Sequence, residues 1–306
     1  MNIIDCVNGA LELGVVGGGT MGLGIAQVAA QRSLGCAVLE VDPGARERAR
    51  SQLTKALTKA DERGKLAGTL DEALGCITWA ESVKDLADCG VIIEAIPEIK
   101  EAKLGVFADL DEVCSPRTIL ASNTSSIPIA TLAAATTRPG RVVGLHFFNP
   151  VPAMQLVEVV ASLTTDDDVT HAAEAFVRDR LGKQTIRAKD QAGFVVNAIF
   201  VPYLLSAIRS FDNGVASAED IDAGMVGGCG MPMVHSRCAT SSASTRCFSS
   251  RTACTPSIKT PQPSHPHCCA AMSTQVGWAR RQAVAFTTTP MDRRKADHGR
   301  FDCHRR

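Results

Sequence analysis

Short apolar runs alternate with longer amphipathic stretches through the first two thirds of the chain. Short apolar runs bounded by glycine, proline or polar clusters predict buried strands, and helical spacing of apolar residues predicts helices. Strands are expected from residue 13 up to a glycine-rich loop and at residues 36–41, 91–98, 119–127, 142–148 and 156–160, with a last one from Ile186; helices are expected at residues 25–32, 46–65, 101–113 and 172–181. This alternation predicts an α/β domain with a mostly parallel sheet.

The pattern changes after residue 190. Residues 194–209 are apolar nearly all round and include Pro202, which predicts a buried helix, as at a subunit interface. Ser217 and Asp220 have the spacing of a capping pair and predict the start of another helix. We therefore assign residues 1–189 to the α/β domain and residues 190–233 to the start of a helical domain.

The last 73 residues, 234–306, contain no leucine and no glutamate and are rich in Ser, Thr, Arg, Cys and Pro. Such a segment cannot bury enough apolar surface for a helical core, so we expect it to be disordered and quickly trimmed by trypsin. The cluster from His265 to Cys269 has the residue types of a metal site, but its spacing fits no ordinary zinc pattern, and no metal site is predicted.

The zero formal net charge is the sum of two unlike parts. Residues 1–233 carry 20 basic and 29 acidic side chains, whereas residues 234–306 carry 12 basic side chains against 3 Asp. An acidic body argues against a nucleic-acid partner. The sequence has no charged-then-apolar leader and no apolar run near the roughly 20 residues that a membrane helix needs, which indicates a cytoplasmic protein with no membrane partner.

A glycine-rich loop follows the first predicted strand and precedes a helix. Gly17, Gly19 and Gly22 fit the dinucleotide-binding fingerprint, and Thr20 and Met21 lie in the same loop. The first glycine permits a tight turn, the second allows the backbone to approach a pyrophosphate, and the third lets the helix pack on the strand. The helix N-terminus then favours the anion.

Acidic residues follow two of the predicted strands. Glu40 and Asp42 compete to bind the ribose hydroxyls, and either acid would repel a 2′-phosphate, which favours NAD over NADP. Glu98 is expected to face the cofactor, because ligands of doubly wound sheets lie at the carboxyl ends of the strands. Ser125 and Ser126 follow another strand at this edge, and their alternative role is to cap a helix before Ile129.

His146 lies in an apolar run twelve residues before Glu158, and Asn149, Pro150 and Pro152 mark a turn between them. Two strands reversed about this turn could bring the carboxylate against the imidazole. The carboxylate would fix the tautomer and leave the other ring nitrogen free to exchange a proton with a substrate hydroxyl. Taken alone, His146 is better explained as a satisfied core histidine, but the surrounding motifs reverse this preference. Asn197, a polar residue in the apolar helix, is either a substrate contact or a buried amide bonded to backbone.

Several motifs resemble those of the L-3-hydroxyacyl-CoA dehydrogenases, and most of all the short bacterial 3-hydroxybutyryl-CoA dehydrogenases. They cover most of residues 13–233 in order: GVVGGGTMGLGIAQVAA, VIIEAIPE, ILASNTSSIPI, RVVGLHFFNPVPAMQLVEVV, LGK and GFVVNAIFVPYLLSAI. The resemblance implies a Rossmann-like domain followed by an all-helical domain that forms a homodimer. It implies oxidation of a 3-hydroxyacyl-CoA to a 3-ketoacyl-CoA with NAD, or the reverse.

The resemblance also implies roles for individual residues. His146 matches the catalytic base, Glu158 the carboxylate that orients it, Ser125 a hydroxyl near the reacting oxygen and Asn197 an amide from the helical domain. Glu98 matches an acid on the cofactor side. Glu40 stands where the family usually has Asp, so the charge is kept and we prefer it to Asp42 as the ribose ligand.

A frameshift would explain the tail. In a shifted frame, suitable synonymous codons from Met233 permit Gly-Pro and then a leucine-rich sequence, and Met272 through Thr289 permit a stretch resembling the family's closing segment. One G lost from a run of G after the Met233 codon would produce both, and the helical domain would be truncated. Two further functions therefore remain open. One is an impaired NAD-binding remnant, and the other is a dehydrogenase of small hydroxy acids, which the His146–Glu158 pair disfavours because that group usually relies on a catalytic lysine.

Overall fold

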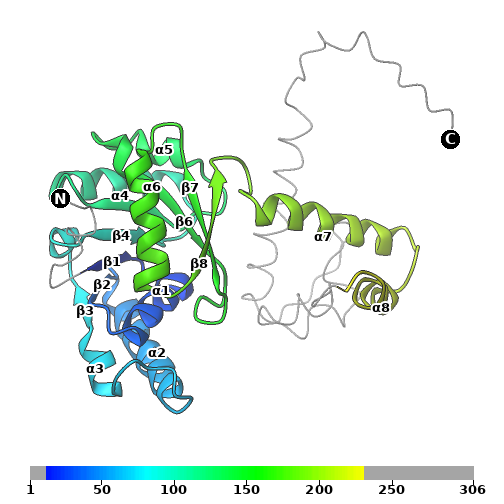
Figure 1. The fold of residues 1–306 in the computed structure, drawn as a ribbon, viewed down its shortest axis with the longest axis horizontal. Helices are drawn as coiled ribbons and strands as arrows, with labels where there is room; N and C mark the ends of the chain where they lie inside the picture. The colour runs from blue at the N-terminus through cyan, green and yellow to red at the C-terminus, as the bar shows by residue number, and fades with distance from the viewer. Residues whose placement is uncertain (1–11, 231–306) are drawn as a thin grey trace, which may run out of the picture. The chain divides into compact units, whose positions relative to one another are not determined.

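The computed structural model describes residues 12–230 of the chain (Figure 1). The predictions made for residues 234–306, including the frameshift, the disorder and the trypsin sensitivity, lie outside the described residues. The chain divides into two compact units, with the boundary between Ala198 and Ile199. The first unit contains the sheet and the second contains most of α7 and all of α8.

One eight-stranded sheet organises the first unit. Its strands are β1 (Leu13–Val16), β2 (Cys36–Leu39), β3 (Ile77–Ala80), β4 (Val91–Glu94), β5 (Ile119–Ser122), β6 (Val142–Phe147), β7 (Leu156–Ala161) and β8 (Gln184–Lys189). They lie in the order β3-β2-β1-β4-β5-β6-β7-β8, and every neighbouring pair is parallel except β6 and β7. The carboxyl ends of β1, β2, β4, β5 and β6 therefore meet at one edge.

Helices connect the strands and cover both faces of the sheet. They are α1 (Thr20–Gln31), α2 (Pro43–Asp61), α3 (Leu70–Gly75), α4 (Lys100–Val113), α5 (Ile129–Ala133) and α6 (Asp167–Ala175), which continues as a π-helix over Phe176–Arg180; short 3-10 turns occupy Val83–Leu86 and Pro139–Arg141. The second unit continues α7 (Val196–Asp212) and contains α8 (Ala218–Cys229). Mostly parallel strands and helical connections give the α/β fold that the sequence predicts.

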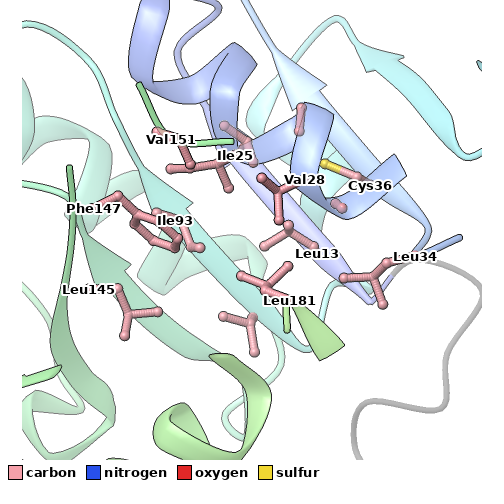
Figure 2. Packing of buried hydrophobic residues seen from close by; sticks show 14 of the residues in the cluster. Leu13, Ile25, Val28, Leu34, Cys36, Ile93, Leu145, Phe147, Val151 and Leu181 are labelled. Atoms are coloured by element: carbon pink, nitrogen blue, oxygen red, sulfur yellow. The ribbon is translucent and has the colours of Figure 1, made fainter. Parts of the chain in front are cut away.

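The core consists of two clusters because successive residues of a strand point to opposite faces. On β4, Ile93 packs in one cluster with Leu13 and Ile25, whereas Ile92 packs in the other with Phe107. Figure 2 shows the first cluster, where side chains from α1 meet those of β1 and β4. Burial on both faces explains why these strands are apolar throughout rather than alternating.

The observed elements correct several predictions. Strands β2, β4 and β5 end at Leu39, Glu94 and Ser122, earlier than expected, because their parallel pairing with the neighbouring strands ends at these residues. Neither α3 nor β3 is predicted from the sequence. Figure 1 shows this pair after α2, at one end of the sheet.

The structure rules out one alternative about a helix start and leaves another helix uncovered within the chain. Ser125 and Ser126 do not cap α5, because the Asp190 carboxylate accepts hydrogen bonds from the N–H groups of Ile129 and Ala130. Helix α7 has no buried side chain, and Ile199 is 71% exposed. The described residues of the chain do not cover this helix, and its burial at a subunit interface stays a prediction. The predicted start of α8 is confirmed, since Ser217 accepts a hydrogen bond from the Asp220 N–H.

No helix within residues 12–230 is long and apolar enough to cross a membrane.

Candidate active site

The glycine loop joins β1 to α1 and has the backbone shape that its sequence predicts. Gly17 has φ +110°, and a Cβ added there would lie 2.8 Å from the Ala95 carbonyl oxygen. A Cβ on Gly22 would lie 1.9 Å from the Gly17 carbonyl oxygen, so only glycine allows α1 to pack this closely on the loop. Both positions therefore need glycine for the packing of protein atoms.

Gly19 differs because the space in front of it is open. A Cβ added there would meet no protein atom within 4 Å. Gly19 is the N-cap of α1, where no side chain caps the helix, and the first turn holds no acidic residue. Thr20 and Met21 are the first two residues of this helix, with Thr20 exposed and Met21 packed partly against the core. Unused N–H groups beside open space fit a pyrophosphate.

Glu40 and Asp42 have different partners. The Glu40 carboxylate accepts hydrogen bonds from the N–H of Gly18 at 3.0 Å and from the N–H of Asp42 at 3.2 Å. Asp42 is the N-cap of α2 and accepts a hydrogen bond from the Ala45 N–H at 2.5 Å. Glu40 thus lies against the glycine loop, whereas Asp42 begins a helix.

A buried charged network lies at the carboxyl ends of β4 and β5. The Lys103 ammonium, 1% exposed, lies 2.6 Å from Glu94 Oε1 and 3.2 Å from Glu98 Oε2. The Ser122 hydroxyl donates to Glu94 Oε2 at 2.6 Å. Lys103 therefore joins one carboxylate at the end of β4 to another in the following loop.

Glu98 in turn holds the loop that follows β5. Its Oε1 accepts hydrogen bonds from the N–H groups of Ser125 and Ser126, each at 3.1 Å, and from the hydroxyls of Ser126 and Thr124. Burial opposes ionisation of Glu98, but Lys103 and the two hydroxyls outweigh it and hold the pKa of this carboxyl below its ordinary value. The carboxylate is therefore charged at neutral pH.

His146 and Glu158 lie directly opposite each other on β6 and β7. His146 Nδ1 lies 2.6 Å from Glu158 Oε2; the histidine is 6% exposed and the glutamate fully buried. The rings of Phe148 and Phe194 pack 4.7 and 5.4 Å from the imidazole, measured between centroids. When Nδ1 carries the proton, it donates a hydrogen bond to the carboxylate, and Nε2 is then the basic nitrogen.

The other two predicted residues lie on the loop after β5 and in the first turn of α7. Ser125 is half-buried, two residues beyond Asn123, whose side-chain oxygen accepts a hydrogen bond from the Phe147 N–H at 2.8 Å. This bond ties the loop carrying Ser125 to the strand carrying His146. Asn197 is half-buried in the first turn of α7.

The 3-hydroxyacyl-CoA dehydrogenase NAD-binding-domain model matches residues 12–191, and the model of the C-terminal domain of the same enzymes matches residues 193–240. The chain belongs to the 3-hydroxyacyl-CoA dehydrogenase family. Its α/β domain is the NAD-binding domain of this family, and the cofactor is NAD.

Curated relatives and solved structures agree with this assignment. A 3-hydroxybutyryl-CoA dehydrogenase of Mycobacterium tuberculosis is 47% identical over 224 residues, which are 72% of this chain and 78% of the relative. A probable 3-hydroxybutyryl-CoA dehydrogenase of Bacillus subtilis is 40% identical over 223 residues, 72% of this chain and 77% of the relative. The crystal structure of M. tuberculosis FadB2 superposes with a TM-score of 0.72 at 46% identity, covering 74% of this chain and 81% of that one.

Three residues of this site are not predicted from the sequence. The pattern places Glu94 in a strand and Lys103 in an amphipathic helix, and Asn123 lies in a motif without a predicted role. A lysine in an amphipathic helix ordinarily faces water, so the hydrophobic pattern of α4 does not predict that Lys103 is buried. An available signal was the strand order, since Glu94 and Ser122 end neighbouring strands in register.

Proposed function

We propose that this chain interconverts 3-hydroxyacyl-CoA and 3-ketoacyl-CoA with NAD, with 3-hydroxybutyryl-CoA as the substrate, in fatty-acid or butanoate metabolism. The observation that carries the proposal is the buried contact of 2.6 Å between His146 Nδ1 and Glu158, at the same sheet edge as the glycine loop. The printed names of the M. tuberculosis and B. subtilis relatives support the choice of substrate.

Oxidation of the substrate removes a hydride from C3 and a proton from the hydroxyl oxygen, and a C=O bond forms. NAD supplies the hydride acceptor. His146 takes the proton at Nε2, since a neutral imidazole can accept a proton near neutral pH and return it in the reverse reaction. Glu158 stabilises the imidazolium that results. In the reverse direction, the same Nε2–H protonates the oxygen.

Ser125 and Asn197 position the substrate in this proposal. The backbone of Ser125 is held by Glu98, so its hydroxyl belongs to an ordered loop. Asn197 follows directly after two N–H groups that bond to Glu158. Holding the reacting oxygen and the thioester lowers the barrier by removing their freedom before the reaction.

The cofactor residues in the proposal are Gly17, Gly19 and Gly22 with Thr20 and Met21 for the pyrophosphate, Glu40 for the ribose and Glu98 as an acid on the cofactor side. The uncapped helix start at Gly19 supports the pyrophosphate assignment. The contact of Glu40 with the Gly18 N–H supports its choice over Asp42.

Residues 1–189 are proposed as the NAD-binding domain and residues 190–233 as the start of the helical domain for substrate binding and dimerisation. The exposed apolar side chains of α7, including Ile199 and Phe200, support a homodimer formed through this part. The acidic charge of residues 1–233 supports a role without nucleic acid, and we propose a cytoplasmic enzyme with acyl-CoA as its partner.

Oxidation of NADH by acetoacetyl-CoA tests the proposal directly. The full chain should turn over, and His146→Gln should lose about 100-fold or more in kcat with little change in the KM for NADH, because only the proton transfer is removed. A wild-type chain that binds NADH but shows no turnover would overturn the proposed enzymatic activity and favour an inactive NAD-binding remnant.

A further inference from the structure

Glu158 is bonded on both of its carboxylate oxygens. Oε2 meets His146, and Oε1 accepts hydrogen bonds from the N–H of Val195 at 3.0 Å and from the N–H of Val196 at 2.8 Å. Val196 is the first residue of α7, a helix of 17 residues, and Val195 precedes it. The carboxylate that meets the histidine therefore also caps the N-terminus of α7.

The two N–H groups are presented by a turn in the left-handed region. Gly193 has φ +77° and Phe194 has φ +51°. Among residues 12–230, Phe194 is one of only two non-glycine residues with positive φ, the other being Ser33. A large side chain rarely adopts this backbone, and such conformations concentrate at functional sites. Here the turn aims two N–H groups at one oxygen and packs the Phe194 ring against His146.

The chemical consequence follows from burial. A carboxylate that is fully buried among apolar residues is costly to ionise unless donors satisfy it. Two N–H groups and the positive end of a helix dipole stabilise the charged form. A charged Glu158 stabilises the positive charge of an imidazolium at His146, because the carboxylate lies next to Nδ1.

We propose that the first turn of α7 is part of the catalytic machinery, with the N–H groups of Val195 and Val196 acting as positioning groups that keep Glu158 ionised and aimed at His146. The proposal rests on the proposed function, in which His146 is the base. In this proposal, the start of α7 influences the proton transfer through its hydrogen bonds to Glu158, without contacting the substrate.

Other charges on the flanking segments have partners of their own. Glu98 pairs with Lys103, Arg187 on β8 pairs with Glu174, and Asp190 bonds to the backbone of α5. A change confined to the start of α7 therefore leaves these bonds in place, and the His146–Glu158 pair is the group that should respond.

The first test uses the wild-type chain alone. In an NMR titration, the amide protons of Val195 and Val196 should shift with the same midpoint as the His146 ring signals, because all three report one coupled pair. The amide of Ala218, the first residue of α8, should not follow this midpoint. Amides of Val195 and Val196 that ignore the His146 titration would overturn the proposal.

The second test removes one donor. Val196→Pro deletes an N–H at the first position of a helix, where proline is tolerated, as Pro43 is in α2. With one donor lost, the pair binds its proton more tightly. The His146 midpoint should rise by about one unit and kcat should fall about 10-fold, with the KM for NADH unchanged. Equal midpoints and kcat in Val196→Pro and wild type would contradict the proposal.

One matched variant serves as the control. Ala218→Pro introduces proline at the same position of α8, where Ser217 caps the helix, and should leave kcat unchanged. If the wild-type chain lacks activity on acetoacetyl-CoA, the proposed function fails, while the NMR midpoints still decide this proposal.

Discussion

Glu40 and Asp42 show at the scale of single residues how position along a loop decides the role of a carboxylate. Both oxygens of Glu40 accept backbone N–H groups, one of them from the glycine loop at Gly18. A carboxylate has about four lone-pair sites, so two remain for ribose hydroxyls. The Asp42 side chain instead accepts a hydrogen bond from the first turn of α2.

Glu40→Gln should therefore raise the KM for NAD about 10-fold and weaken discrimination against NADP, because a charged acceptor and a repulsive charge are both lost. Asp42→Asn is the matched control. Asparagine also caps helices well, so the KM and the stability should hardly change. Steady-state kinetics with NAD and NADP check this. Equal effects of the two substitutions would show that Glu40 does not bind the ribose.

At the scale of elements, identical substitutions in two helices should have opposite effects. Gly22→Ala in α1 places a Cβ 1.9 Å from the Gly17 carbonyl oxygen, and backbone must shift to accommodate it. It should cost about 1–3 kcal/mol of stability and most of the NAD affinity. Gly105→Ala in α4 meets no atom within 4 Å and should stabilise the protein by about 0.5–1 kcal/mol.

Urea unfolding of both variants and NADH titration by fluorescence check the pair. Since α4 lies in the same domain, Gly105→Ala also reports whether alanine by itself perturbs the fold. A Gly22→Ala variant with wild-type NAD affinity would contradict the close approach of α1 to the glycine loop.

The elements also show what the sequence can predict. Strands buried on both faces, such as β4 and β6, are continuous apolar runs and were found from their pattern. Edge strand β3 was missed, because Ile77 to Ala80 bury only one residue fully and alternate with polar neighbours too briefly to form a pattern. The pairing of His146 with Glu158 was predictable from a turn between two runs. The burial of Lys103 was not, because its partners come from another strand and loop.

At the scale of the whole molecule, ion pairs between distant segments tie one helix to a strand and another to a loop. Arg187 on β8 bonds to Glu174 on α6 at 2.6 and 2.8 Å, and Arg138 bonds to Asp111 on α4 at 2.7 Å. The hydrogen bond from Arg187 is the main cause that holds the pKa of Glu174 below its ordinary value of 4.5. At Asp111, burial raises the pKa, but Thr137 and Arg138 outweigh it and the pKa is lowered.

These lowered values fix the direction in which acid acts on the fold. As pH falls below 4.5, the unfolded chain binds a proton at Glu174 before the folded chain does, so the free energy of unfolding decreases until the folded pKa is passed.

Because Arg187 is 55% exposed, the pair contributes only about 0.5–1 kcal/mol. Glu174→Gln should therefore lower the stability by this amount at pH 7, and the difference from wild type should vanish in acid. Urea unfolding across this range measures it, with Glu112→Gln on α4 as the control for loss of an exposed carboxylate. A difference that stays constant from pH 7 into acid would mean that the Arg187–Glu174 pair does not stabilise the fold.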